Sequence, residues 1–429
     1  MKKFYLLGKN ILFPICRSLT GNGNRKTLFK IKNLFPDLRI KKVKSGTKAF
    51  DWKIPPEWNV TDAFILDKFN KKIIDFKENN LSLLGYSEKK FSYIKKKDLL
   101  KKIFFLKKIP NAIPYVASYY KRRWGFSTSY KQVRMIKSKY NNNDFFNVVI
   151  KSNKNKNGYL NYGELVIKGK SQKEILISTY ICHPSMANDN LSGIIISMAL
   201  INYYKRKKLK KTLRFIFIPE TIGSIYYISK NLKRLRKNLL GGYNLTCLGD
   251  EREYSLMFSK YKDKPSDEAI IEAYKILRIK KYRIHSFLKR GSDERQFNSP
   301  GIDLPITSVF RSKYGEYKEY HTSLDNFNLV TLKGLKESFK VVKTAINILL
   351  NNIYPKTKIL CEPQMGKRGL YPTLSTTKNK GIVDSYMDFL QYSDGKNSLK
   401  KISKLIGLNN SKTNQIYRLL LKENLIFKN

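Results

Sequence analysis

The chain has 429 residues, which is too long for one ordinary domain, so we expect two or three domains. Hydrophobic residues make up 41% of the chain and aromatic residues 13%, which excludes the class of disordered proteins with low hydrophobicity. The formal net charge of +52 is suited to binding nucleic acid, anionic membranes or acidic polymers. The lysines are spread along the whole chain, however, and this favours a general composition bias over one dedicated binding patch.

The cysteines and the N-terminal segment indicate the compartment. The four cysteines are far apart and contain no C-x-x-C pair, which argues against a disulfide framework or a thiolate zinc site and fits a reducing compartment. Near the N-terminus, Gly8-Lys9-Asn10 interrupts the apolar run that an export signal needs. No segment approaches the roughly 18 uninterrupted apolar residues of a membrane span. We therefore expect a cytoplasmic protein without a membrane span.

Short strand-like pieces dominate residues 52–140. They lie at 63–66, 72–76 and 81–86, and Pro, Asn and Gly residues separate them. This texture differs from that of the residues on either side. We expect a small β-rich domain at 52–140 that overhangs the functional site and is inserted into a core formed by residues 1–51 and 141–360.

The core contains four near-continuous apolar runs, at 174–182, 212–218, 243–248 and 304–310. Such runs are typical of strands that are buried on both faces. Helix-period apolar positions occur between or after them, at 191–204, 267–277 and 332–350. This alternation predicts an α/β fold with a mostly parallel central sheet flanked by helices, which binds its ligand at the carboxyl ends of the strands.

Helical texture returns near the C-terminus, after a Pro, Gly, Thr and Lys-rich linker at 361–380. Helices are predicted at 385–392, 398–406 and 411–421, and Gly407 lies between the last two. Two short helices around such a turn form a helix-turn-helix pattern, so residues 361–429 are expected to be a linker and a third domain. The residues predicted to face outward from its last helix are Lys412, Thr413, Asn414, Gln415 and Arg418. A DNA partner and a protein partner both remain open.

Two of the three histidines stand in positions suited to chemistry. His183 follows the first apolar run directly, and Asp189 lies in the loop before the next helix. Taken alone, such a histidine is more often a structural hydrogen-bonding residue, and such an aspartate is more often a helix cap. Together, however, a His and an Asp in one strand-to-helix loop are suited to binding zinc through N and O.

Later segments of the core add three more candidates. Glu220 follows the second apolar run, Asp250 follows the third, and His321 lies in a polar loop before the last long helix. Because strand ends meet at one edge of a parallel sheet, we expect His183, Asp189 and His321 to lie within a few ångströms of one another. Glu220 at the same edge is the candidate general base.

Four long phrases in the sequence carry a family resemblance. They lie at 113–125, 182–193, 291–297 and 313–325. In these phrases, and in the order of its site residues, the chain resembles the co-catalytic zinc aminopeptidases. It resembles more closely the bacterial aminopeptidase-like proteins of polysaccharide-biosynthesis loci. The resemblance implies a zinc exopeptidase-like core, a small inserted domain and a C-terminal winged helix.

The resemblance also implies roles for individual residues. His183 and Asp250 would bind one zinc ion, Asp189 would bridge, His321 would bind a second ion, and Glu220 would be the base. Thr221 stands where the two-zinc enzymes have a metal-binding glutamate, and Ser185 stands where they have an acid. One zinc ion or two are therefore both open, and the substitute ligands that we consider are Asp293 and Glu294.

Two arginines near the expected site are candidates for substrate binding. Arg295 and Arg311 could each hold a carboxylate or phosphate, although in so basic a chain a plain surface role fits them equally well. The expected function is zinc-dependent hydrolysis of a peptide or other amide bond on a small or carbohydrate-linked substrate. The alternative is a nucleic-acid-binding regulator whose aminopeptidase-like core has degenerated.

Overall fold

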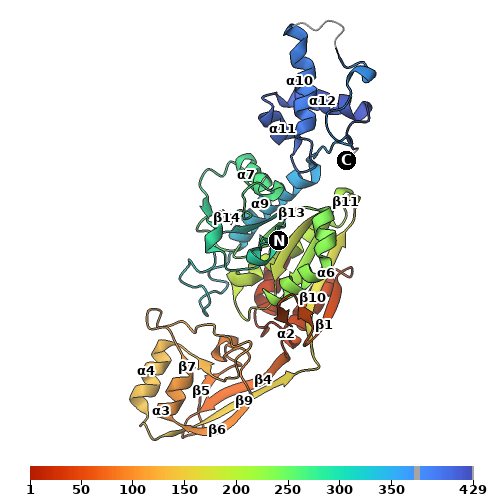
Figure 1. Ribbon diagram of the computed structural model, residues 1–429. Helices are drawn as coiled ribbons and strands as arrows, with labels where there is room; N and C mark the ends of the chain where they lie inside the picture. The colour runs from red at the N-terminus through yellow and green to blue at the C-terminus, as the bar shows by residue number, and fades with distance from the viewer. Residues whose placement is uncertain (372–376, 428–429) are drawn as a thin grey trace.

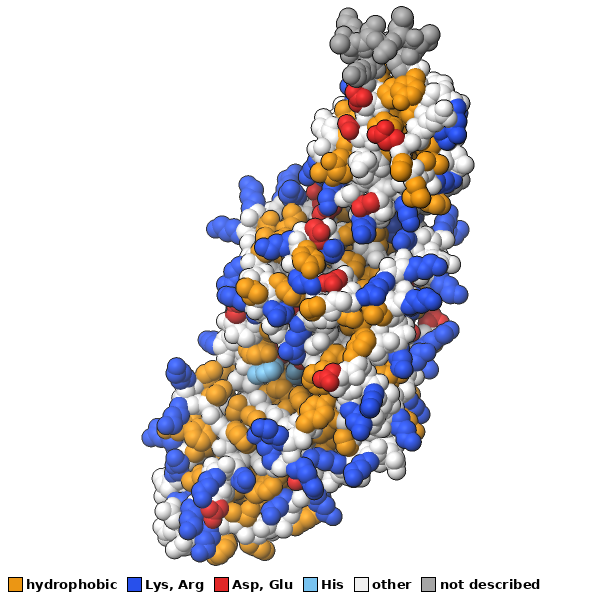
Figure 2. All heavy atoms as spheres, in the orientation of Figure 1, with side chains coloured by type: hydrophobic (Ala, Val, Ile, Leu, Met, Phe, Trp, Pro, Cys, Tyr) orange, Lys and Arg blue, Asp and Glu red, His pale blue; other side chains and the backbone are white. Residues whose placement is uncertain are grey.

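The computed structural model describes residues 1–371 and 377–427. The molecule is elongated and consists of three parts in a row (Figure 1). The insert lies at one end, the core lies in the middle, and the C-terminal helical domain lies at the other end. Lysine and arginine side chains cover all three parts of the face in Figure 2, which matches their even spread in the sequence.

The core is built on an eight-stranded sheet in the order β1-β10-β12-β11-β13-β16-β14-β15. Its strands are β1 (Arg39–Lys44), β10 (Tyr159–Ile167), β11 (Gly169–Tyr180), β12 (Leu209–Ile218), β13 (Leu239–Leu245), β14 (Ser255–Met257), β15 (Arg283–His285) and β16 (Ile306–Phe310). The four central strands β12, β11, β13 and β16 run parallel. Antiparallel pairing occurs toward the edges, between β1 and β10, between β10 and β12, and between β14 and β16. The predicted α/β sheet is thus confirmed, with a parallel centre.

Helices cover both faces of this sheet. They are α1 (Lys2–Leu7), α2 (Asn22–Leu34), α5 (Ser192–Tyr204), α6 (Ile222–Asn238), α7 (Pro265–Ile276), α8 (Glu294–Phe297) and α9 (Leu332–Asn351). Successive strand residues point to opposite faces, so Ile175 and Ile177 of β11 join the apolar core that contains α5, α7 and α9. Leu176 and Tyr180 join the second core, which contains α6 and the insert. A strand buried on both sides needs apolar residues throughout, and for this reason these strands could be predicted as continuous runs.

The insert contains a second, four-stranded antiparallel sheet in the order β5-β4-β9-β6. The elements of this part are β2 (Lys48–Ala49), β3 (Trp52–Lys53), β4 (Glu57–Leu66), β5 (Lys72–Asp75), β6 (Lys90–Lys95), α3 (Lys96–Leu99), β7 (Ile103–Phe104), β8 (Phe126–Ser127), α4 (Tyr130–Lys139) and β9 (Phe145–Asn155). The predicted boundary at residue 140 is wrong, because β9 pairs with both β4 and β6 and belongs to this sheet. The piece at 81–86 contains only isolated bridges and a short helical turn.

The C-terminal domain contains α10 (Thr377–Gln391), α11 (Leu399–Leu405) and α12 (Asn410–Lys422). It begins before the predicted boundary at 361, because Lys356 and Thr357 form bridges with Asp394 and Ile426. The predicted linker at 361–380 is in part structured, since Met365 is buried in the core of this domain, while residues 372–376 lie outside the described residues.

Side-chain caps begin α11 and α12, and ion pairs attach α11 to the core domain. The side chain of Ser398 caps the N-terminus of α11, and that of Asn409 caps the N-terminus of α12. Thr413, predicted to face outward, is buried. Lys400 and Lys401 of α11 form ion pairs with Glu272 and Glu268 of α7, at 2.7 and 3.1 Å, so one face of α11 contacts the core.

Two further expectations concern the whole chain. Within residues 1–371 and 377–427, no helix combines the length and the apolar character needed to cross a membrane. All four cysteines are free: Cys16, Cys182, Cys247 and Cys361.

Candidate metal and catalytic site

The candidate site lies at the carboxyl ends of the central strands, where the insert meets the core. His183 follows β11, Asp189 lies in the turn Ala187–Leu191 before α5, and Glu220 follows β12. His321 lies in the long loop between β16 and α9. Histidine atoms are visible between the insert and the core in Figure 2.

His183, Asp189 and His321 form a compact cluster. Each offers one ligand atom, and these atoms all lie within 4.8 Å of one another. His183 Nδ1 lies 3.9 Å from Asp189 Oδ1, and His321 Nε2 lies 3.0 Å from Asp189 Oδ2. The expected proximity of the three residues is therefore confirmed.

The unpaired atoms of this cluster fit a metal ion. His183 Nδ1, Asp189 Oδ2 and His321 Nε2 are buried and form no well-aligned hydrogen bond, although the last two face each other at 3.0 Å. Buried polar atoms are rarely left unpaired, because their desolvation then goes uncompensated. Two imidazole nitrogens and a carboxylate oxygen are also the donors that zinc prefers in catalytic sites. The residues present thus fit zinc in number and in kind.

The protonation of the cluster suits metal binding as well. Burial lowers the pKa of His183 to about 4, so its imidazole is neutral at pH 7. Burial by itself would raise the pKa of Asp189, but His183, His321 and Tyr180 outweigh burial and hold that pKa at about 2. A neutral imidazole and an ionised carboxylate are the forms that bind a cation.

Three buried side chains hold the cluster in place. Arg17 Nε donates a hydrogen bond to the carbonyl oxygen of His183 at 2.8 Å, and Tyr180 Oη donates one to Asp189 Oδ1. Asp325 accepts hydrogen bonds from the backbone N–H groups of Asn188 and Asp189, at 2.5 and 3.0 Å. Asp325 was not among the predicted site residues, although it lies only four residues after His321.

Glu220 lies beside the cluster. Its Oε2 is 3.7 Å from His183 Nε2, and its Oε1 accepts a hydrogen bond from Ser292 Oγ at 2.7 Å. Burial raises the pKa of Glu220, and the nearby carboxylates of Asp293 and Asp189 raise it further. A carboxylate with a raised pKa is suited to accept a proton near neutral pH and to release it again.

Thr221 stands where the two-zinc enzymes have a metal-binding glutamate, and Asp293 contacts it. The Thr221 backbone N–H donates to Asp293 Oδ1 at 2.8 Å, and Asp293 Oδ2 is buried without a partner. Burial raises the pKa of Asp293 to about 6. Glu294, the other substitute considered, accepts hydrogen bonds at both oxygens, from Gly291 and Ser292 N–H groups at Oε1 and from Ser308 at Oε2. Of Asp293 and Glu294, only Asp293 therefore has a carboxylate oxygen that is free to bind a metal ion.

The structure does not bring Asp250 into the cluster, which corrects the expected ligand set. Asp250 Oδ1 accepts from Ser312 Oγ and from the Arg252 N–H, at 2.9 and 3.0 Å. Its Oδ2 accepts from Asn188 Nδ2 and from the Ser312 N–H, at 3.1 and 3.0 Å. With both oxygens occupied by donors, Asp250 supports the turn that carries Asp189 and offers no free oxygen to an ion.

The two arginines differ in position. Arg295 lies at the site, where its Nη2 donates to Thr221 Oγ1 at 2.8 Å and its charge lowers the pKa of Glu220. Arg311 instead forms an ion pair with Glu337 at 3.0 Å and stacks over the ring of Tyr254.

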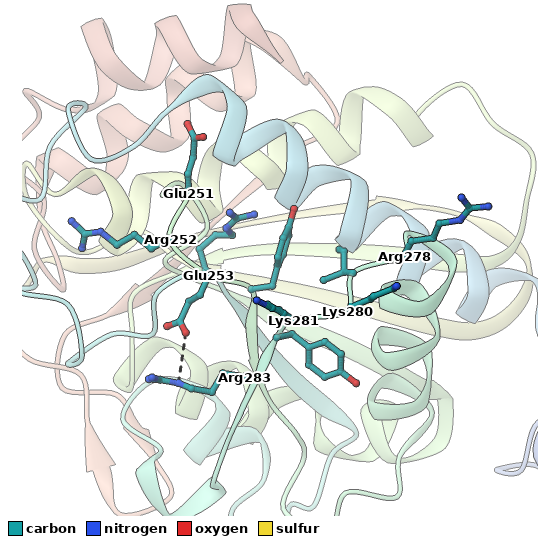
Figure 3. Close-up of a pocket in the computed structure, with 11 residues that line it drawn as sticks. Glu251, Arg252, Glu253, Arg278, Lys280, Lys281 and Arg283 are labelled. Atoms are coloured by element: carbon teal, nitrogen blue, oxygen red, sulfur yellow. Dashed lines mark ion pairs between the residues drawn. The ribbon is translucent and has the colours of Figure 1, made fainter.

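Arg311 lines a separate cavity of about 590 Å³. This cavity lies at the start of β14 and β15, and Figure 3 shows its Arg252 and Arg278 pointing in opposite directions. The contacts of Arg311 thus place it outside the cluster.

The insert contributes an aromatic residue to the site. The Tyr115 N–H donates to the carbonyl oxygen of His321 at 2.7 Å, and Pro114 forms a bridge with Thr322. The Tyr115 ring packs edge-on against His183 and His321, with ring centroids 5.6 and 5.1 Å apart. As expected, the insert thus reaches over the site, and it does so through Tyr115. The sequence analysis did not single out this residue, although it lies in the phrase at 113–125.

Comparisons with known proteins agree with this architecture. The family described as a domain of unknown function, DUF4910, matches residues 7–352, and a winged helix-turn-helix family matches residues 352–428. A Clostridium acetobutylicum protein, named as a polysaccharide biosynthesis protein with an aminopeptidase-like domain, is 41% identical over 401 residues. That match covers 92% of this chain and 90% of the relative.

Solved structures give the same picture. A Clostridium acetobutylicum protein described as a peptidase is 39% identical, with a TM-score of 0.79, over 99% of this chain and 96% of its own. The zinc aminopeptidase BSAP of Bacillus subtilis is 14% identical, with a TM-score of 0.57, over 80% of this chain and 92% of its own, and shares the fold. The chain therefore belongs to the DUF4910 family, among the bacterial aminopeptidase-like proteins of polysaccharide-biosynthesis loci that carry a C-terminal winged helix.

Proposed function

We propose that the chain is a zinc-dependent hydrolase of an amide bond, with His183, Asp189 and His321 as ligands and Glu220 as general base. The observation that carries the proposal is the set of three buried ligand atoms within 4.8 Å of one another, none of them in a well-aligned hydrogen bond, with Glu220 beside them. The fold shared with zinc aminopeptidases supports the reaction type. The name of the 41% identical relative supports a carbohydrate-linked substrate.

The residues of the site divide the chemistry between them. A zinc ion held there would supply a Lewis acid that polarises the scissile carbonyl and activates the attacking water. Glu220 accepts the proton of that water and returns it to the leaving nitrogen. The Ser292 hydroxyl binds Oε1 of Glu220 and so leaves Oε2 directed toward His183. Tyr115 shields the two imidazole rings from bulk water, and Arg295 is placed to bind an anionic group of the substrate.

We propose a single zinc ion for this site. A second ion needs further carboxylate ligands, and two features argue against them. Thr221 offers no carboxylate, and both oxygens of Asp250 already accept hydrogen bonds. Asp293 Oδ2 is the one free carboxylate oxygen among the described candidates, and one oxygen is too few to hold a second ion. Three protein ligands and one open position form the usual catalytic zinc site.

The test compares two isosteric variants at the site. Glu220→Gln keeps the shape of the side chain but cannot accept the proton, so turnover should fall about 10²–10⁴-fold while zinc stays bound. Asp189→Asn removes a ligand charge, so zinc itself should be lost. The substrates are aminoacyl anilides and acylated amino sugars, and the control is Glu268→Gln, because Glu268 of α7 pairs with Lys401 outside the cluster. Full turnover by Glu220→Gln, or zinc loss equal to that of Asp189→Asn, would refute this division of roles.

A nucleic-acid partner for the winged helix is the second candidate function. The observation that favours it is the exposed face of α12, which carries Lys412, Asn414, Gln415 and Arg418. Lysine and arginine bind phosphates, and amide side chains can read base edges. Lys412→Glu combined with Arg418→Glu should weaken binding to duplex DNA at 150 mM salt. Unchanged binding would leave protein contact as the role of this domain.

A further inference from the structure

The four-stranded sheet of the insert has one buried face and one open face. Ile65, Val148 and Ile150 belong to the buried face and are part of an apolar core. The next residues along each strand point the other way and lie on the open face. Phe91, Tyr93 and Phe145 stand there with 54%, 71% and 49% of their surface exposed. Large aromatic side chains gathered on one open face usually mark a binding surface.

The strand register joins these side chains into a continuous platform. Phe91 pairs with Val149, which pairs in turn with Phe64. Tyr93 pairs with Asn147, which pairs with Leu66. Direct cross-strand partners share a face and lie about 4.5–5.5 Å apart at Cβ. Two adjacent rows of side chains, mostly apolar, therefore run across β6, β9 and β4. We call them the sheet platform.

Polar groups within and around the platform have unused binding capacity. The carboxamide of Asn147 lies between Tyr93 and Leu66 and forms no hydrogen bond with another described residue. Lys89 and Lys95 lie over the rings of Phe91 and Phe145, 5.4 and 5.8 Å from the ring centroids. Neither lysine forms an ion pair with any carboxylate in the described ranges. The platform thus combines flat apolar rings, one amide and unpaired cations.

From this combination we infer that the sheet platform binds an acidic polysaccharide. The C–H face of a sugar ring can stack on Phe91 and Tyr93, the Asn147 amide can bind sugar hydroxyl groups, and the lysines can pair with the acid groups. The inference is independent of the proposed hydrolase activity, because the platform contains none of its residues.

Features of the same face disfavour two other occupants. Asp75 and Asp62 also lie on it, paired with Lys72 and Lys77, so the face has no unbroken track of cations for a phosphodiester backbone. A second copy that extended this sheet edge to edge would pair along β6, an edge strand with lysine at both ends, where like charges repel.

The test uses uncharged substitutions, because a chain with a net charge of +52 will adhere weakly to any polyanion. Binding of the full chain to immobilised polygalacturonate is measured at 150 mM salt by interferometry, with dextran and oligo(dT) as comparison ligands. The variants are Phe91→Ala combined with Tyr93→Ala, and Asn147→Ala alone. The matched control is Tyr261→Ala. Tyr261 is 62% exposed and has Lys260 and Lys264 over its ring, but it lies on the surface of the core domain, away from the sheet platform.

We expect the double variant to bind polygalacturonate at least about tenfold more weakly, because hot spots of binding are dominated by a few aromatic anchors. Asn147→Ala should bind several-fold more weakly, and Tyr261→Ala should bind as the wild type does. All variants should melt as the wild type does, since substitutions of surface side chains outside special contacts change stability little. Unchanged affinity in the double variant would overturn the inference. So would equal affinity for dextran, or tighter binding to oligo(dT) that depends on Phe91 and Tyr93.

Discussion

Asp325→Asn is the substitution that tests most sharply how the metal cluster is held. Asp325 is fully buried, and its Oδ1 accepts the Asn188 N–H at 2.5 Å. Its Oδ2 accepts the Asp189 N–H at 3.0 Å and the Tyr317 hydroxyl at 2.9 Å. An asparagine has only one side-chain oxygen, so in either orientation its NH₂ group faces a backbone N–H donor. One backbone N–H then loses its acceptor in the interior, and the amide N–H directed at it finds no acceptor there either.

The magnitude follows from these contacts. Each buried donor left without an acceptor costs about 1–3 kcal/mol, so we expect a loss of about 3 kcal/mol in the free energy that orders the Asp189 turn. Because Asp189 is a proposed ligand, part of this loss should appear in metal binding. Residues that orient a ligand typically change metal affinity by about 10–100-fold when substituted, and we expect a zinc dissociation constant raised by that factor.

The assay is a zinc titration against a chromophoric chelator, together with thermal unfolding of the zinc-free protein. Burial raises the pKa of Asp325 to about 7, so the measurements belong at pH 8, where the carboxylate is ionised. Asp303→Asn is the matched control, because Asp303 is exposed and pairs with Lys260 and the Gly301 N–H, away from the cluster. If Asp325→Asn bound zinc as tightly as the wild type and melted at the same temperature, the positioning role assigned here would be refuted.

Two further substitutions test the junction of insert and core. Glu57→Gln should lower the free energy of unfolding at pH 7 by about 2–3 kcal/mol, because Arg25 and the Tyr159 N–H outweigh burial and hold the pKa of Glu57 at about 2. A carboxyl group whose pKa is lowered by folding stabilises the fold above its unfolded pKa near 4.5, and this stabilisation is lost as the pH falls toward 2. The free energies of unfolding of variant and wild type, measured by denaturant titration, should therefore converge in acid. A difference that stayed constant with pH would contradict this. Tyr115→Ala should retain zinc and lose about tenfold in kcat/KM, since it exposes both imidazole rings to water; unchanged kcat/KM would exclude a role for its ring.

The core could be predicted from sequence because of how its strands are buried. Strands covered on both faces are apolar at most positions. β16 lies within its predicted run, and β11, β12 and β13 overlap theirs but begin earlier. The boundary of the insert could not be found in the same way. β9 buries one face and exposes the other, and it continues almost directly into β10 of the main sheet, so its texture was assigned to the core.

The candidate site could be predicted in part for similar reasons. His183, Asp189 and Glu220 follow parallel strands, whose carboxyl ends meet at one edge of the sheet, and His321 was predicted from its polar loop before the last long helix. A carboxylate after a strand can equally accept hydrogen bonds, as Asp250 does, and nothing in the sequence separates the two roles. Tyr115 reaches the site only through pairing between loops about 200 residues apart in the chain, which local periodicity does not reveal.

The zinc content of purified protein tests the central claim most directly. Wild-type chain, dialysed with zinc and then against metal-free buffer, is compared by atomic absorption with His183→Ala. The control is His285→Ala, because His285 is also buried but lies at β15 beside Glu316, outside the cluster. We predict about one zinc ion per chain in the wild type and in His285→Ala, and essentially none in His183→Ala. A wild type free of zinc, or a His183→Ala variant with its full complement, would contradict the account.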